Sequence, residues 1–406
     1  MSQNAKLTSP SSPKLKNKFK LLGLLIFCFQ ITYGQHIQIK KLDGKKITSA
    51  QVDKIVQQLM DTAHVTGLAL SILNDNKIVY TKAYGYKNNK TKELLNTSTV
   101  LYGASFSKAV FAYLTMIIVQ EGKLDLDKPL YKYLDKLLPE YENFSDLAGD
   151  NRWKLITARM CLSHTTGFPN WRFLNAQTGA FEAEGKLAIY FTPGTRYAYS
   201  GEGLMLLQLV IEKVTGKNLE ELAEEKVFLP IGLMRTSYIW QERFENDFAY
   251  GHNENEELLG KKKRKKPGGA GSLETTIADY ARFVEYMMQG NGLNRKWRKE
   301  MLKPQIQIHS KYQFPTISDE VTQKNRNIRL SYGLGWVLLK SKYGKAFFKE
   351  GHDDGWQHYN INFINKRTSI IIMTNSSNGE KIFKEILERL IGDTFTPWEW
   401  ERYIPY

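Results

Sequence analysis

Short apolar runs with the period and length of β-strands lie near both ends of the chain. The run at residues 68–73 is followed by turn-forming residues 74–77, and apolar residues resume at 78–81, which predicts an antiparallel hairpin. Near the other end, four runs predict further strands, at residues 334–339, 346–349, 359–364 and 369–374. Residues 365–367 have turn chemistry and join the last two of these strands.

The middle of the chain has the apolar spacing of helices. Residues 105–121 and 203–215 each carry apolar positions three or four apart, and Thr276 with Asp279 resembles a capping box that opens a helix ending at Gly290. A last helix is predicted at residues 380–390. The pattern predicts an α+β fold: one antiparallel sheet formed by both chain ends and flanked by helices, with an inserted, mainly helical region.

The N-terminus has the pattern of a secretory signal peptide. Four lysines (Lys14, Lys16, Lys18 and Lys20) precede an apolar run at residues 21–29, and small residues at Thr32 and Gly34 suit cleavage before Gln35. A membrane anchor is the alternative, but about 20 apolar residues are needed to span a bilayer. A lipid anchor on Cys28 is disfavoured by the bulky Phe27. We therefore expect residues 1–34 to be removed and the mature protein to be exported, periplasmic or secreted, without a membrane span.

Composition narrows the class of protein. With 42% apolar and 24% charged residues, the chain can build a core, which excludes a disordered, collagen-like or coiled-coil protein. The two cysteines, Cys28 and Cys161, exclude a disulfide scaffold and a cysteine-rich zinc module. Only Cys161 would remain after signal cleavage, so no intrachain disulfide is expected.

The formal charge of +15 is concentrated in few places. Five lysines belong to residues 1–34, and six cations form one run at residues 261–266. Because no aromatic residues interrupt this run and Pro267 follows it, we expect a solvated surface loop. Contact with anionic envelope polymers is the alternative, and nucleic acid is not an expected partner.

Two segments carry residues suited to acid–base chemistry. Ser105 and Lys108 are three apart on a predicted helix, so the lysine can approach the hydroxyl and, with a lowered pKa, activate it. Tyr199 lies at the junction between a Pro193-Gly194 turn and a buried helix. It can act as a proton carrier if neighbouring cations lower its pKa.

A third segment, residues 351–356, lies between two predicted strands, where backbone N–H groups can bind an oxyanion. His352 and His358 also suggest a metal site, but no recognised ligand spacing is present. The sequence therefore predicts no metal and no cofactor.

The order and spacing of these three segments resemble the serine β-lactamase-related family, which contains class C β-lactamases, DD-peptidases and esterases. Further landmarks of that family extend over roughly residues 50–390: residues 67–68, 121–126, 162–169, 269–272 with Asp279, 332–336 and 374–376. The resemblance implies a β-lactamase/transpeptidase-like catalytic domain at residues 35–406. Its sheet region would be about 48–103 and 270–400, and its helical region about 104–269.

The resemblance also implies roles. Ser105 resembles the acylated nucleophile, Lys108 its partner, and Tyr199 the proton-shuttling tyrosine. The backbone amides of Ser105 and Gly355 would form the oxyanion hole, and His352 would line the substrate site. His164, a further landmark, is interpreted as structural because it lies away from the three segments in sequence.

Two positions depart from the family pattern. Gly201 follows Ser200 where the family usually has Asn, and Asp354 stands where it usually has Gly. We expect weak or absent β-lactam hydrolysis, which Gly201→Asn with Asp354→Gly would raise.

The sequence thus predicts an exported serine hydrolase that cleaves an ester or amide, in a small-molecule or peptide-like substrate, through an acyl-enzyme. One alternative is a non-catalytic or penicillin-sensing binding module on the same scaffold. The other is an α/β-hydrolase, since residues 103–107 partly imitate a Gly-x-Ser-x-Gly elbow. No feature of the sequence specifies an oligomeric state.

Overall fold

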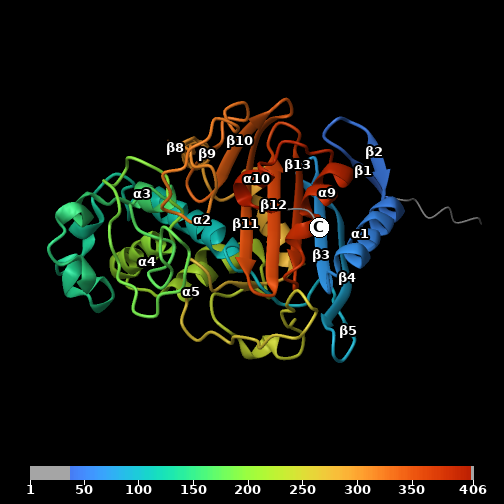
Figure 1. The fold of residues 1–406 in the computed structure, drawn as a ribbon, viewed down its shortest axis with the longest axis horizontal. Helices are drawn as coiled ribbons and strands as arrows, with labels where there is room; N and C mark the ends of the chain where they lie inside the picture. The colour runs from blue at the N-terminus through green and yellow to red at the C-terminus, as the bar shows by residue number, and fades with distance from the viewer. Residues whose placement is uncertain (1–36, 404–406) are drawn as a thin grey trace, which may run out of the picture. The chain divides into compact units, whose positions relative to one another are not determined.

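A nine-stranded antiparallel sheet forms the centre of the fold (Figure 1). The computed structural model describes residues 37–403, so the predicted signal peptide lies outside the described residues. The strand order is β5-β4-β3-β13-β12-β11-β10-β9-β8. The strands are β3 (Gly67–Asn74), β4 (Lys77–Asn88), β5 (Glu93–Leu94), β8 (Ile306–Gln307), β9 (Ser331–Tyr332), β10 (Val337–Ser341), β11 (Gly344–Asp353), β12 (Trp356–Phe363) and β13 (Thr368–Thr374).

The two ends of the chain meet in this sheet, where β3 pairs with β13. Leu70 lies opposite Ile372 in this antiparallel ladder, and both strands are buried along their whole length. In Figure 1 the blue N-terminal strands accordingly lie beside the red C-terminal ones. The prediction of one sheet built from both chain ends is confirmed.

Helices cover both faces of the sheet because each carries an apolar side. On one face, α1 (Ser49–Ala63) and α9 (Glu380–Leu390) share a buried apolar cluster with Leu70, Tyr359 and Ile372. On the other face, α2 (Phe106–Gln120) and α7 (Ile277–Gln289) share a second cluster with Ala69, Phe347 and Met373. Alternate residues of each strand therefore point to the two clusters.

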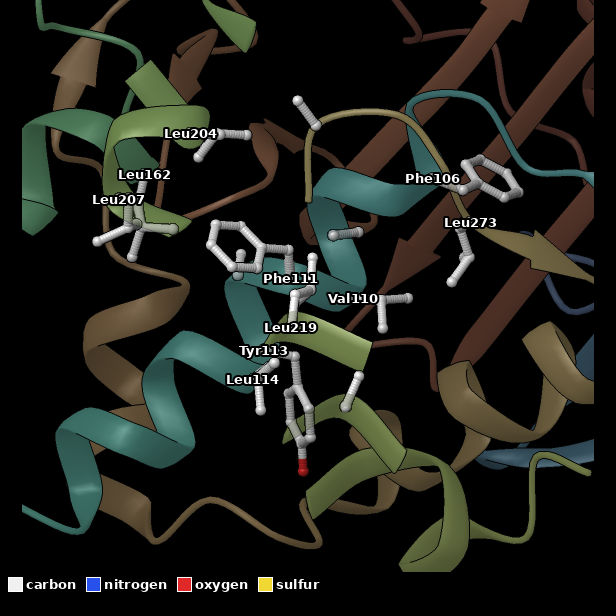
Figure 2. Packing of buried hydrophobic residues seen from close by; sticks show 14 of the residues in the cluster. Phe106, Val110, Phe111, Tyr113, Leu114, Leu162, Leu204, Leu207, Leu219 and Leu273 are labelled. Carbon is white, nitrogen blue, oxygen red and sulfur yellow. The ribbon is translucent and has the colours of Figure 1, made fainter. Parts of the chain in front are cut away.

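The helical region surrounds α2, which is buried on nearly every side. Figure 2 shows Val110, Phe111 and Leu114 of α2 packed among leucines from other segments, including Leu204, Leu207 and Leu219. The remaining α-helices are α3 (Ala158–Leu162), α4 (Gly201–Thr215), α5 (Leu219–Ala223), α6 (Leu229–Ile231), α8 (Arg295–Met301) and α10 (Trp398–Glu401). The helix α2 is thus a fixed support for whatever its N-terminus carries.

Short elements connect these parts. Two small two-stranded sheets pair β1 (Gln38–Lys40) with β2 (Lys46–Thr48), and β6 (Leu101–Tyr102) with β7 (Glu274–Thr275). The short 3-10 and π-helical segments are η1 (Leu130–Tyr133), η2 (Leu138–Glu140), η3 (Glu142–Leu147), η4 (Asn151–Leu155), η5 (Glu224–Phe228) and η6 (Glu242–Phe244). Among residues 37–403, no helix combines the length and the apolar character needed to cross a membrane.

Two local predictions differ from the structure. Strand β11 extends to Asp353, whereas the segment beginning at Gly351 was expected to lie between two strands. The apolar pattern stops at Phe348 although the backbone pairing with β12 continues to Asp353. At the start of α7, Thr276 accepts a hydrogen bond from the Asp279 amide, but the Asp279 carboxylate accepts from the Arg235 amide instead of closing a capping box.

Candidate active site

Ser105 lies at the turn that begins α2. The Gly103 amide donates to the Leu273 carbonyl at 2.7 Å, and Ala104 adopts a left-handed conformation with φ of 45°. This turn leads into Ser105, the N-cap residue, whose side chain makes no capping hydrogen bond. Its Oγ instead accepts a hydrogen bond from Lys108 Nζ at 3.0 Å.

Ser107 is oriented differently and serves the turn. Its Oγ donates to the Ala104 carbonyl at 2.5 Å and accepts from the Leu273 amide at 2.9 Å. Both bonds are to backbone, and the side chain is fully buried. Ser107 therefore holds the turn that presents Ser105.

Lys108 is buried with neutral hydrogen-bond partners. Its side chain donates to the Ala270 carbonyl at 2.6 Å as well as to Ser105, and its Nζ lies 5.0 Å from the ring centre of Tyr199. Burial lowers the pKa of Lys108 well below its ordinary value, and the charge of Lys349 lowers it further. An amine in these surroundings loses its proton readily and can accept one from Ser105.

Tyr199 contacts both lysines of the site, Lys108 and Lys349. Lys349 Nζ donates to the Tyr199 hydroxyl at 2.9 Å, and Lys108 Nζ lies over the Tyr199 ring. The structure therefore brings Ser105, Lys108 and Tyr199 together. The expectation that cations lower the pKa of Tyr199 is wrong, because burial and the charge of Glu350 raise that pKa well above its ordinary value.

Lys349 and Glu350 are site residues that the sequence analysis missed. Lys349 is fully buried, and its Nζ lies 2.7 Å from Glu350 Oε1, which also accepts from Gln313 Nε2 at 2.9 Å. Burial lowers the pKa of Lys349, whereas Glu350 opposes that shift through its charge and its hydrogen bond. A lysine directly after the apolar residues 346–348 of a predicted strand was the signal for this position.

The predicted roles of His352 and Gly355 stay predictions, and the structure gives both residues hydrogen-bond partners other than Ser105. The His352 side chain is exposed, on the α9 side of β11, with Nδ1 2.6 Å from Glu380 Oε1. The Gly355 amide, in the two-residue turn between β11 and β12, donates to Ser377 Oγ at 2.8 Å. Lys349, three positions before His352 on β11, is the residue that donates to the Tyr199 hydroxyl.

The two departures from the family pattern also look different in the structure. Asp354 is exposed in the β11–β12 turn. At Gly201, a Cβ atom would lie 2.7 Å from the Asn170 carbonyl oxygen and 3.0 Å from the Trp171 ring. Gly201→Asn would therefore displace this segment, and the expected gain in β-lactam turnover from the double substitution no longer follows.

His164 packs directly behind Tyr199, although it is distant in sequence. Their ring centres are 4.5 Å apart, and His164 Nδ1 accepts a hydrogen bond from the Ser200 amide at 3.1 Å. Burial and the nearby lysines lower the pKa of His164 well below its ordinary value, which keeps the ring neutral. His164 thus positions the segment that carries Tyr199, and the expectation that it lies away from the site is wrong.

The basic run at residues 261–266 is only partly a solvated loop. Lys261 is buried, with Nζ 2.6 Å from Glu274 Oε2 and 4.8 Å from the Trp356 ring centre. Arg264 stacks on Tyr102 at 3.8 Å, whereas the other four cations are exposed, as expected. The run is therefore anchored beside the site and leads into Ala270, the acceptor for Lys108.

Comparisons with known proteins find related sequences. A family model described as "Beta-lactamase" matches residues 52–392. The chain is 24% identical over 344 residues to penicillin-binding protein 4* of Bacillus subtilis (strain 168), covering 77% of this chain and 68% of the relative. It is 29% identical over 209 residues to a putative D-alanyl-D-alanine carboxypeptidase of Escherichia coli O157:H7, covering 46% of each chain. The chain thus spans about half of that relative's length.

Solved structures share the fold. An octameric penicillin-binding protein homologue from Pyrococcus abyssi superposes with a TM-score of 0.67 at 21% identity, covering 86% of this chain and 79% of the other. The D-alanine carboxypeptidase AmpC from Burkholderia cenocepacia gives a TM-score of 0.63 at 20% identity, covering 84% and 98%. These similarities support the predicted fold class.

Proposed function

Because this chain belongs to the Beta-lactamase family, we propose that it is a serine hydrolase that cleaves an ester or amide through an acyl-enzyme on Ser105. One observation carries the proposal: buried Lys108 places its Nζ 3.0 Å from the Ser105 hydroxyl oxygen. A serine needs such a base, because its hydroxyl is a weak nucleophile on its own.

Acylation begins with Lys108 as a neutral amine. Ser105 Oγ attacks the carbonyl carbon of the substrate, and its proton passes to Lys108 Nζ. When the tetrahedral intermediate collapses, the bond to the leaving group breaks and the leaving group takes the Tyr199 proton. Lys349, which donates a hydrogen bond to Tyr199, returns a proton to the phenol oxygen.

The two lysines can hold different protonation states because their neighbours differ. Lys108 bonds to an alcohol and a carbonyl, whereas Lys349 bonds to the Glu350 carboxylate. The surroundings therefore favour a neutral Lys108 and a charged Lys349. Such pairs, pushed apart in pKa by their surroundings, divide the roles of base and acid.

We propose that the amides of Ser105 and His352 hold the oxyanion. Asp353 and Trp356 flank a two-residue turn, so the alternating ladder directs the His352 N–H away from β12. The pairing of β11 with β10 ends at Phe348, which leaves that edge open beside Lys349 and Tyr199. Two such donors stabilise the charge that develops on the carbonyl oxygen.

The substrate proposed first is a peptide ending in two D-alanine residues, with simple esters as the second class. The names of the two relatives support this choice: one is a penicillin-binding protein and the other a putative D-alanyl-D-alanine carboxypeptidase. The signal-like pattern of residues 1–34 supports export, so the enzyme would act outside the cytoplasm.

The test is covalent labelling followed by turnover. The protein should take up a fluorophosphonate probe and a fluorescent penicillin, and Ser105→Ala should abolish both. Release of D-alanine from a D-Ala-D-Ala peptide, measured beside p-nitrophenyl ester and nitrocefin hydrolysis, separates the substrate classes. A protein that keeps the penicillin label and turns over neither the peptide nor the esters would be a sensor.

Ser107→Ala is the control variant. It removes the two backbone bonds that hold the turn, so the melting temperature should fall while labelling persists. Loss of labelling in a folded Ser107→Ala protein, with labelling retained in Ser105→Ala, would overturn the assignment of the nucleophile.

A further inference from the structure

A cavity of about 560 Å³ lies beside Tyr113, in the middle of α2, between the end of α7, α8 and the start of β11. Its apolar lining includes Met287, Met288, Met301, Leu302 and Phe347. None of Ser105, Lys108, Tyr199 and Lys349 lines it. A mostly apolar cavity of a few hundred cubic ångströms is typical of a small-molecule site. The three methionines can adapt their shape to a flexible chain.

Five cations line the same cavity, and no carboxylate does. Arg295, Arg298 and Lys299 come from α8, Lys303 follows that helix, and Lys345 faces them from β11. All five are exposed. Of these five cations, only Lys303 has a carboxylate from the described residues 37–403 within 4.0 Å of its charged group, that of Glu300. The apolar interior is therefore bordered by positive charge that the described part of the chain leaves largely uncompensated.

We propose that this cavity binds an amphiphile with one alkyl chain and an anionic headgroup, such as a fatty acid anion. The alkyl chain would displace water from the partly exposed Met287, Met288 and Leu302, which is favourable in proportion to the apolar area buried. The carboxylate would accept charge-assisted hydrogen bonds from Arg298 or Lys345 at the entrance. An uncharged alkyl compound would gain only the burial of apolar area, and an inorganic anion would gain only the hydrogen bonds from the cations.

Direct binding of laurate to the whole protein, measured by calorimetry, tests this proposal. We expect saturable binding at one site, and binding of uncharged methyl laurate weaker by about tenfold or more. The double substitution Arg298→Gln with Lys345→Gln should weaken laurate binding by a similar factor, because it removes the charged hydrogen-bond donors to the laurate carboxylate. Met288→Trp should weaken both ligands, because the larger ring fills the cavity.

The matched control is Lys46→Gln with Lys54→Gln, which removes the same charge from exposed positions outside the cavity. It should leave laurate binding unchanged. Equal weakening in the control and the cavity variant would show attraction to net charge alone and would overturn the proposal. Equal affinity for laurate and methyl laurate would overturn it as well.

A vesicle arm separates a monomeric ligand from a membrane surface. The protein is mixed with phosphatidylglycerol or phosphatidylcholine vesicles and centrifuged with them. Uptake of monomeric laurate that Met288→Trp abolishes supports the cavity. Co-sedimentation with phosphatidylglycerol vesicles, without uptake of monomeric laurate, would overturn it, because an exposed basic surface needs no cavity to bind an anionic bilayer.

Discussion

Glu350 is buried beside Lys349, and its charge bears on both lysines of the site. It lies 2.7 Å from Lys349 Nζ, and it raises the pKa of Lys108 as well as that of Lys349. Its buried carboxylate therefore sets how easily each amine loses its proton.

Glu350→Gln should move the pH profile of probe acylation to lower pH. Without the carboxylate, the pKa values of both lysines fall, so Lys108 becomes neutral at lower pH and Lys349 loses its charge earlier. Labelling rates measured from pH 5 to pH 10 would show both limbs of the profile move in the acid direction. Leaving Lys349 charged and unpaired would also cost about 3–5 kcal/mol of unfolding free energy, measured in urea.

Glu121→Gln is the control, because it removes an ion pair with Lys226 at a half-exposed position. It should leave the profile unchanged. If Glu350→Gln lowered the rate equally at every pH, Glu350 would be a structural residue with no influence on the lysines.

Tyr199→Phe should lower the turnover of an ester substrate by roughly 10²–10⁴, the usual contribution of a positioned proton carrier. The ring would keep its packing against His164, so only the hydroxyl and its hydrogen bond with Lys349 are lost. Turnover and melting temperature are measured together. A variant that unfolds more easily and keeps its turnover would make Tyr199 a packing residue.

The site shows what sequence spacing could and could not predict. Ser105 and Lys108 are one helical turn apart, so local spacing was enough to place them together. Lys349 was missed because its role depends on β11 bringing it to Tyr199, a contact between residues 150 positions apart. The roles of His352 and Gly355 stay predictions, and apolar periodicity did not reveal that β11 continues to Asp353.

At the scale of elements, the short C-terminal helix α10 places a buried acid behind the site. Glu401 is 4% exposed, and the Tyr359 hydroxyl donates to its Oε2 at 3.3 Å. Burial raises the pKa of Glu401 well above its ordinary value. The charges of Glu350 and Glu380 raise it further, and Lys349 opposes them. The folded protein therefore holds a proton that the unfolded chain releases at moderate pH.

Glu401→Gln should make stability less dependent on pH. When folding raises the pKa of a carboxyl group, the protonated group contributes its full stabilisation at pH values below the ordinary carboxyl pKa. This contribution is lost as the pH rises toward the pKa of the folded state. In that pH range, the unfolding free energy of the wild type should therefore fall relative to that of Glu401→Gln by up to about 1.4 kcal/mol per pH unit. Urea unfolding at pH 4 to pH 8 measures the difference.

Glu399→Gln provides the comparison on the same helix, since Glu399 is exposed and pairs with Lys324 at the surface. The unfolding free energy of Glu399→Gln should change with pH in the same way as that of the wild type. A constant difference between Glu401→Gln and the wild type would mean that Glu401 has an ordinary pKa in the fold.

At the scale of the whole molecule, residues far apart in sequence stabilise one sheet. The contribution of both chain ends to one sheet was predictable, because apolar runs of strand length occur at both chain ends around a helical middle. The order of strands across the sheet was not predicted, because it depends on long-range pairing. The expectation of one catalytic domain at residues 35–406 stays a prediction, and it implies cooperative unfolding.

Ile372→Ala tests that cooperativity at the junction of the chain ends. Ile372 is fully buried in β13, opposite Leu70 of β3 and Tyr359 of β12, so the cavity should cost about 2–5 kcal/mol. Leu94→Ala, at an exposed position of the edge strand β5, should change stability by no more than about 0.5 kcal/mol. If the sheet and helical regions unfold together, circular dichroism and probe labelling of Ser105 will lose signal at one urea concentration, and Ile372→Ala will shift both midpoints equally. Labelling lost well before the circular dichroism signal would mean that the helical region around α2 unfolds by itself, contradicting a single domain.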